Sequence, residues 1–298
     1  MKKLFITGGS GMLGSYAAVQ AAEKGWDVTA SYRHNAIELP GCRTVQLELS
    51  NAEQVLEVIA SASPNAIIHT AAQAKPDFCE QNKLAAFEAN VIGTFNIVRA
   101  AEKIGAHLVH ISTDTVFNGE KNPYKENDTL SPPNYYGLTK AAAEAAVATS
   151  NGGWAIVRTS IIFGPRKFPF QESFSDKIID ALKAGNRIKA YADQYRCPIP
   201  AWNLADACLE IVERRLTGIF HVECPDVVSR LEWALKIAEV FNLPKSLIEP
   251  MYMDSSPGIA NRSKILVLDV SNTIQKLHTP LLGFEESINE LKRRMTND

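Results

Sequence analysis

The sequence predicts an α/β fold, a Rossmann-type doubly wound parallel sheet followed by a smaller C-terminal substrate-binding domain. Short β-rich runs alternate with helical patterns through the first half of the chain, which is typical of βαβ units. A glycine-rich turn joins the first of these strands to the first helix. After Pro165 the pattern loosens and prolines become frequent. We therefore expect a Rossmann domain over 1–165 and a smaller region over 166–298, with 203–222 returning to the main sheet.

The elements follow from periodicity and from the position of turn residues. Apolar runs rich in β-branched residues predict the strands, and apolar positions three and four residues apart predict the helices. Strands are expected at 3–7, 28–32, 44–47, 66–69, 107–112 and 154–158. Helices are expected at 12–24, 53–60, 83–104, 136–149, 173–184, 204–215, 231–241 and 285–294.

Composition narrows the class of protein. The 298 residues include 31 Lys and Arg against 33 Asp and Glu, a formal net charge of −2 that argues against nucleic acid or a membrane surface as partner. No secretory signal or spanning segment is recognisable, and the five cysteines are scattered without CxxC pairs. These features predict a cytoplasmic protein with reduced thiols and a small-molecule ligand.

The first glycine-rich turn predicts a dinucleotide site. Gly8, Gly11 and Gly14 lie between the first strand and the first helix. Glycines at such positions permit a tight turn, close approach of a pyrophosphate and close packing of helix on strand. The helix N-terminus then faces the anion. We interpret this segment as the phosphate loop of a nicotinamide cofactor site.

The end of the second strand favours NADP. Enzymes specific for NAD place an acid there, whereas an Arg accommodates the 2′-phosphate of NADP. The segment here carries Ser31 and Arg33, and Asp27 lies at the opposite end of the strand. Arg33 therefore predicts recognition of the phosphate.

A second group of residues predicts proton transfer. Tyr136 and Lys140 are four residues apart at the start of a helix, so they share one face. A neighbouring ammonium would lower the pKa of the phenol. Thr113 follows the fifth strand, at the sheet edge where α/β proteins build ligand sites. We predict that these three residues are catalytic.

Together these segments resemble the extended short-chain dehydrogenase/reductase superfamily and, within it, the dTDP-4-dehydrorhamnose reductase family. The stretch 111–119 is similar to that family's STDYVFxG and 136–140 to its YGKTK. Further similar segments are 90–94, 158–160 (RTS) and 193–195 (DQY). Segments 77–80 and 241–244 also resemble the regulatory β subunit of methionine adenosyltransferase.

The resemblance implies site residues beyond those read from the motifs. It implies that Asn90 supports the site behind Lys140, that Leu49 touches the adenine, and that Tyr136 and Lys140 also hold the nicotinamide ribose. It assigns the pyrophosphate to Gly11, Met12 and Leu13, the cofactor wall to Ala71, Ala72 and Gln73, and the substrate side to Thr113, Asp114, Ile161 and Arg262.

The departures from that family's pattern lie on the substrate side. Thr115 replaces an aromatic residue, Ile161 replaces a Trp, and Pro198-Ile199 replaces Pro-Thr. A late RPxNS loop survives only as Arg262-Ser263.

The function expected from this resemblance is NADPH-dependent reduction of a 4-keto nucleotide sugar, with no metal. A non-catalytic NADP-binding regulatory subunit and a nucleotide-sugar epimerase remain alternatives. A homodimer is a candidate assembly. Candidates for the substrate diphosphate are Lys167, Arg187, Arg196 and Arg262.

Overall fold

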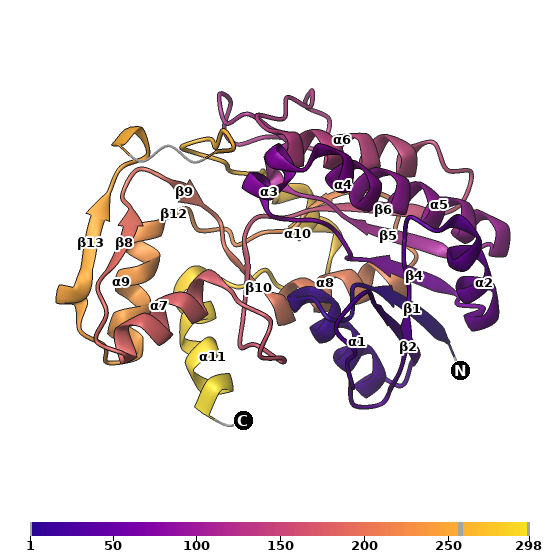
Figure 1. Ribbon diagram of the computed structural model, residues 1–298, viewed down its shortest axis with the longest axis horizontal. Coiled ribbons are helices and arrows are strands. Elements are labelled where there is room, and N and C mark those ends of the chain that lie inside the picture. The colour runs from indigo at the N-terminus through magenta and orange to yellow at the C-terminus, as the bar shows by residue number, and fades with distance from the viewer. Residues whose placement is uncertain (1, 256–258, 297–298) are drawn as a thin grey trace.

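A parallel sheet of seven strands runs through the larger part of the molecule (Figure 1). The structure is a computed structural model that describes residues 2–255 and 259–296. Every neighbouring pair in the order β11-β6-β5-β4-β1-β2-β3 is parallel, which confirms the predicted Rossmann-type fold. The strands are β1 (Lys3–Thr7), β2 (Asp27–Tyr32), β3 (Cys42–Gln46), β4 (Ala66–His69), β5 (His107–Ile111), β6 (Trp154–Arg158) and β11 (Gly218–His221).

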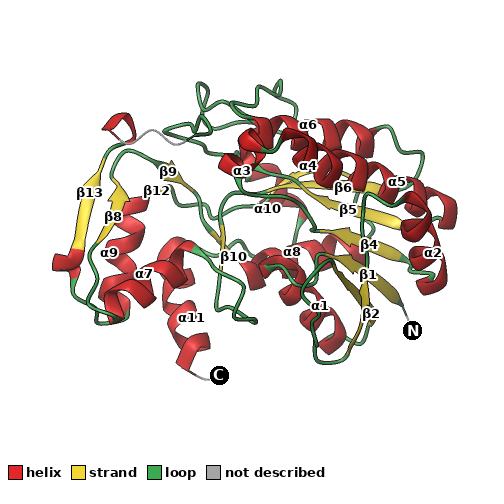
Figure 2. Ribbon diagram, viewed as in Figure 1, coloured by secondary structure: helices red, strands yellow, loops and turns green. Residues whose placement is uncertain are grey.

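Helices cover both faces of this sheet, as Figure 2 shows. Apolar residues of α1 and α8 belong to one buried cluster, and those of α2, α5 and α6 belong to a second cluster on the opposite face. The central strand β4 is buried along its whole length, as expected for a strand covered on both sides. The helices are α1 (Met12–Glu23), α2 (Ala52–Ala62), α5 (Gly93–Ile104), α6 (Tyr135–Ala148) and α8 (Ala201–Glu213).

The remaining elements lie mostly at the other end of the molecule. They include three short strand pairs, of which β8 with β13 is the longest, and the helices α7, α9 and α11 (Figure 1). Their bounds are β7 (Ile162–Phe163), α7 (Phe174–Lys183), β8 (Ile188–Tyr191), β9 (Tyr195–Arg196), β10 (Ile199–Pro200), β12 (Val228–Ser229), α9 (Arg230–Val240), β13 (Ile248–Met251), α10 (Ser271–Lys276) and α11 (Phe284–Thr296).

The segment 203–222, which was expected to return to the main sheet, contains the edge strand β11. The strand β11 pairs with β6, with Gly218 opposite Ala155 and His221 opposite Arg158. The chain thus leaves the sheet after β6 and comes back to its edge about sixty residues later. The boundary near residue 165 stays a prediction.

Most predicted elements are confirmed within two or three residues, and one is corrected. The expected helix 83–104 is divided into α4 (Lys83–Phe87), a π-helical turn η1 (Glu88–Ile92) and α5. Such turns often mark functional sites, and this one presents Asn90. The short helix α3 (Pro76–Gln81) was missed because six residues are too few for a periodic pattern.

No helix within 2–255 and 259–296 is long and apolar enough to cross a bilayer.

Candidate active site

The glycine-rich turn between β1 and α1 is packed against itself. Gly8 has a φ of +71°, which favours glycine, and its carbonyl oxygen accepts the Gly11 N–H at 2.8 Å. A Cβ on Gly14 would lie 2.2 Å from that same oxygen, so only glycine fits there. On Gly11 a Cβ would meet only the Gly8 oxygen, at 3.1 Å, which leaves the other side of the turn open. The turn therefore fits a bound pyrophosphate.

A cavity of about 320 Å³ opens beside this turn. Met12, Leu13 and Gly14 are not among its lining residues, and the Leu13 side chain is buried in the core instead. Of the other residues expected at the cofactor, Tyr136 and Lys140 line a neighbouring cavity, and the remaining eight line this one. These residues are Gly8, Gly11, Ser31, Arg33, Leu49, Ala71, Ala72 and Gln73.

Arg33 meets a carboxylate in this cavity. Its Nε lies 2.6 Å from Glu48 Oε2, and both side chains line the cavity. Glu48 follows β3, whose residue Gln46 is opposite Tyr32 of β2. The end of β2 itself carries no acid, as the sequence indicated, but the end of the neighbouring strand β3 brings Glu48 to the same place.

Two local features place the start of α6 beside the loop after β5. Asn134 caps the helix, because its Oδ1 accepts the Gly137 N–H at 3.0 Å. A Cβ on Gly137 would lie 2.2 Å from the Thr115 carbonyl oxygen, so this glycine permits the close approach of helix and loop. The approach brings Tyr136 next to Thr113.

The Tyr136 phenol and the Thr113 hydroxyl share a hydrogen bond. Thr113 Oγ1 gives its own proton to Asp114 Oδ1 at 3.0 Å and accepts the Thr115 N–H at 3.1 Å. Burial raises the pKa of Tyr136, and the hydrogen bond to Thr113 opposes that shift. The expectation that Lys140 lowers this pKa is wrong here, because desolvation dominates. At neutral pH the phenol keeps its proton.

Lys140 is fully buried and turned toward the sheet. Its Nζ donates to the Ile111 carbonyl oxygen at 2.7 Å and lies 3.0 Å from His110 Nε2. Burial lowers the pKa of Lys140 to about 8, with Glu144 opposing the shift. Burial also holds the pKa of His110 well below its usual range, so His110 accepts from the ammonium. One proton of Lys140 remains for a ligand.

Asn90 joins the cofactor wall to α6. Its Oδ1 accepts the Gln73 N–H at 2.7 Å, and its Nδ2 donates to Thr139 Oγ1 at 2.9 Å. Thr139 is the neighbour of Lys140, so the expected support of the lysine by Asn90 runs through the helix. The amide fixes the distance between the two halves of the site.

A buried ion pair fixes α6 to the sheet. Arg158 at the end of β6 meets Glu144 in two parallel contacts, Nη2 to Oε2 at 2.7 Å and Nε to Oε1 at 3.0 Å. Ser112 Oγ also donates to Glu144. Both charges are almost completely buried, so each needs the other. Arg158, the first residue of the RTS segment, therefore has a structural role in attaching α6 to the sheet.

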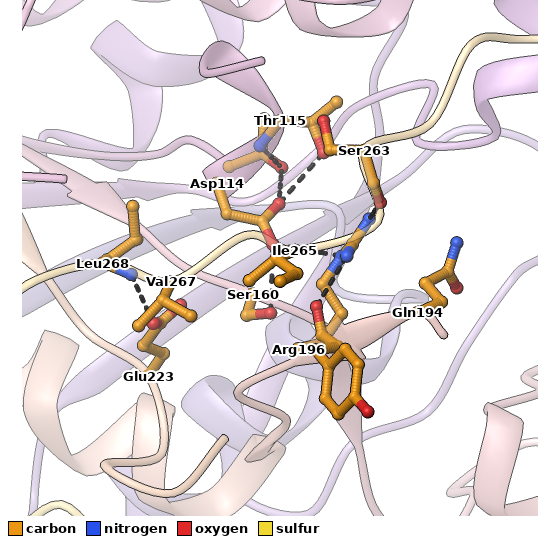
Figure 3. Close-up of polar contacts among 12 residues, drawn as sticks. Asp114, Thr115, Ser160, Gln194, Arg196, Glu223, Ser263, Ile265, Val267 and Leu268 are labelled. Atoms are coloured by element: carbon orange, nitrogen blue, oxygen red, sulfur yellow. Dashed lines mark hydrogen bonds and ion pairs between the residues drawn. The ribbon is translucent and has the colours of Figure 1, made fainter. Parts of the chain in front are cut away.

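The three residues predicted to be catalytic line a second cavity of about 530 Å³. All four residues expected on the substrate side line it, namely Thr113, Asp114, Ile161 and Arg262, together with Tyr136 and Lys140. The Asp114 carboxylate is occupied, because it also accepts from Thr115 Oγ1 at 2.9 Å and Ser160 Oγ at 3.0 Å (Figure 3). Asp114 therefore holds the loop around Thr113 in place.

Of the four cations expected at a diphosphate, two line this cavity. Both Nη atoms of Arg196 donate hydrogen bonds to main-chain carbonyl oxygens, among them that of Ser263 at 2.8 Å (Figure 3). Arg262 Nη2 lies 2.7 Å from Asp77 Oδ2. Lys167 and Arg187 are not among the lining residues, and Arg187 pairs with Glu249.

Arg230 was not predicted as a site residue from the sequence. This residue lines both the catalytic cavity and an adjoining cavity of about 840 Å³. Its guanidinium carbon lies 4.4 Å from the Phe174 ring centre and 5.3 Å from that of Trp233, and its Nε donates to Gln194 Oε1 at 3.2 Å. One feature of the sequence could have indicated a functional role for this residue. Arg230 is a cation in the first turn of a capped helix, where the helix dipole disfavours it.

Fold and site together define a Rossmann-type protein with the Tyr-Lys-Thr arrangement of a short-chain dehydrogenase/reductase. The family described as RmlD substrate binding domain matches residues 1–297, and the chain belongs to that family.

Relatives of known sequence and structure agree with this assignment. Methionine adenosyltransferase 2 subunit beta of Rattus norvegicus is 33% identical over 291 residues, 95% of this chain and 83% of that protein. The dTDP-4-dehydrorhamnose reductase of Bacillus anthracis in complex with NADP has a TM-score of 0.89 at 27% identity, covering 99% of this chain and 100% of that one. A hypothetical dTDP-4-dehydrorhamnose reductase from Sulfolobus tokodaii has a TM-score of 0.83 at 36% identity, covering 96% and 99%.

Proposed function

We propose that this protein is an NADPH-dependent reductase of a 4-keto nucleotide sugar. The observation that carries the proposal is the position of Tyr136, Lys140 and Thr113. They line one wall of the 530 Å³ cavity, which shares Thr70 and Ala72 with the dinucleotide cavity beside it. Similarity over the full chain to the reductase solved with NADP supports the same proposal.

The residues have complementary roles in reducing a ketone to a secondary alcohol. NADPH, when bound, supplies the hydride to the carbonyl carbon and becomes NADP⁺. Tyr136 gives its phenolic proton to the carbonyl oxygen, so one hydride and one proton complete the alcohol. Thr113 fixes the phenol before the reaction. Lys140 has one proton left for the cofactor ribose or the phenolate, which regains its proton from water.

The environment of Arg230 is evidence that the substrate is an anion. Within the described part of the chain it forms no ion pair, whereas Arg262 is balanced by Asp77, and Arg196 lies 3.8 Å from Asp114. Burial lowers the pKa of Arg230 to about 9, which leaves it charged at neutral pH. A desolvated cation without a counter-ion favours an anion from solution. Because Arg230 lies between two cavities, it suits the diphosphate of a sugar nucleotide spanning both.

The test is to incubate a set of nucleotide-linked 4-keto sugars with NADPH and to measure the loss of NADPH absorbance. We expect stoichiometric oxidation of NADPH with at least one of them. An epimerase that regenerates its own cofactor would convert sugar without net oxidation, so the same assay separates the two activities. The absence of oxidation with every keto sugar would reject the reductase.

A non-catalytic subunit is the second candidate, favoured by the 33% identity to methionine adenosyltransferase 2 subunit beta. The complete Thr113, Tyr136 and Lys140 set argues for catalysis. Purification from the native cells, with identification of co-eluting proteins, tests the alternative. The cytoplasmic location and the homodimer stay predictions, and sedimentation velocity of the purified chain tests the second.

A further inference from the structure

The dinucleotide cavity contains a carboxylate beside the expected phosphate-binding guanidinium. Arg33 Nε lies 2.6 Å from Glu48 Oε2, and the two side chains are 57% and 38% exposed. Both line the same cavity as the phosphate turn. The pair therefore stands where the adenosine ribose of a dinucleotide would be recognised, at the ends of β2 and β3.

Both partners are anchored to this edge of the sheet. The second oxygen of Glu48 accepts from Ser50 Oγ at 3.0 Å, and the Glu48 N–H donates to Gln54 Oε1 at 2.9 Å. Gln46 Nε2 donates to the Arg33 carbonyl oxygen at 2.9 Å. These contacts hold the carboxylate at the cavity wall, so it remains beside the ligand rather than turning into solvent.

A carboxylate in this position acts differently on the two dinucleotides. It accepts a hydrogen bond from a ribose 2′-hydroxyl, which is how NAD enzymes use an acid in this region. A 2′-phosphate instead meets an electrostatically unfavourable neighbour and a guanidinium that is already paired. Hydrogen bonds from Ser50 and Arg33 keep the pKa of Glu48 below its ordinary value although burial opposes them, so the carboxylate is ionised at neutral pH.

From this geometry we infer that Glu48 determines dinucleotide specificity, because it competes with the 2′-phosphate for Arg33 and offers an acceptor to the unphosphorylated ribose. The inference rests on the proposed cofactor site. It means that this chain binds NADH as well as NADPH, with a preference for NADPH that Glu48 reduces.

The experiment is calorimetric titration of NADPH and NADH, and of the fragments adenosine 2′,5′-bisphosphate and AMP, into four proteins. These are the wild type, Glu48→Gln, Arg33→Ala and the double variant. We expect Glu48→Gln to raise the ratio of NADPH to NADH affinity about two- to fivefold, in the range of an exposed ion pair. The two fragments should show the same change, which confines it to the 2′ position.

Two further results show whether Glu48 acts by competing with the 2′-phosphate for Arg33. In the Arg33→Ala background, the effect of Glu48→Gln should fall to less than half, because the competition requires the guanidinium. Glu57→Gln, an exposed residue of α2 outside the cavity lining, removes the same charge and should leave the ratio unchanged. An unchanged or lowered ratio in Glu48→Gln would overturn the inference, as would an equal effect in both backgrounds.

Failure of the proposed reductase would give a different pattern. If no keto sugar is reduced but both dinucleotides bind, the titrations still test Glu48. If neither dinucleotide binds to the wild type, the cofactor site itself is wrong and the inference about Glu48 is rejected with it.

Discussion

The two ligand-binding regions of this molecule are built in opposite ways. The dinucleotide cavity takes most of its lining from loops that directly follow β1, β2, β3 and β4, and its charged pair, Arg33 with Glu48, is partly exposed. The substrate side combines residues from distant parts of the chain, and several of its charges, such as Asp114 and Arg196, are buried. An exposed pair can exchange partners at low cost, whereas removal of one partner of a buried pair leaves an uncompensated charge. The first region therefore suits adjustable recognition, and the second suits fixed geometry.

The sharpest test of the fixed region is Tyr136→Phe, which removes one hydroxyl and keeps the ring. Reduction should slow by about 10²–10⁴-fold, the usual contribution of a positioned general acid. The dissociation constant of NADPH should change little, as measured by titration. A variant that turns over its best substrate at the wild-type rate would remove Tyr136 from the mechanism.

Stability should distinguish buried from exposed pairs in the same way. Glu144→Gln leaves the Arg158 guanidinium buried without its counter-ion, and we expect the free energy of unfolding to fall by about 3–5 kcal/mol. Asp206→Asn breaks the exposed pair of Lys24 with Asp206 and should cost less than about 1 kcal/mol. Urea denaturation of both variants measures the difference. Equal losses would contradict the contrast.

Arg230→Met tests the substrate side alone, because Met retains much of the packing on Phe174 and Trp233 and removes the charge. We expect the KM for the nucleotide sugar to rise about 10- to 100-fold, as for a lost charge-assisted hydrogen bond of about 1.5–3 kcal/mol. NADPH affinity should be unaffected. Arg187→Met, at an exposed position paired with Glu249, is the matched control and should leave KM unchanged.

The smallest effect is expected from pH, through Lys140. Burial lowers its pKa to about 8, so the ammonium is lost as the pH rises through that value. The proposed role of Lys140 requires its ammonium form, so kcat/KM should be about tenfold lower at pH 9 than on the neutral plateau. We use kcat/KM because its pH dependence reflects the pKa values of the free enzyme. Lys140→Arg, which stays charged, should flatten the profile of the remaining activity. A wild-type profile that is flat to pH 10 would reject this role of the ammonium.

The contrast also explains how much could be predicted from the sequence. Gly8, Gly11 and Gly14 are close neighbours in the chain, so their spacing and their position between a strand and a helix predicted the phosphate turn. Tyr136 and Lys140 share one helical turn and were found for the same reason. Glu48 was not predicted, because this carboxylate follows β3 and reaches the end of β2 only through the pairing of the two strands.

On the substrate side no local pattern specifies the partners. Arg196 was predicted as a phosphate ligand, yet its donors are consumed by carbonyl oxygens from around residue 264, a pairing that spacing cannot reveal. Arg230 forms no ion pair with any residue that the structure describes, and a sequence pattern cannot show the absence of a partner. Its place between Phe174 and Trp233 follows from tertiary packing of α7 on α9.

The pairing of β11 with β6 has a consequence for the order of folding. The edge of β6 can be covered only after Gly218–His221 has been synthesised, which is about three quarters of the way along the chain. Until then a nascent or truncated chain presents an apolar parallel edge, Ala155 to Val157, with unpaired backbone groups. A fragment ending near residue 165 would contain every predicted catalytic residue and still be prone to aggregate. The cofactor half thus depends on the later half of the chain for its solubility as well as for its substrate.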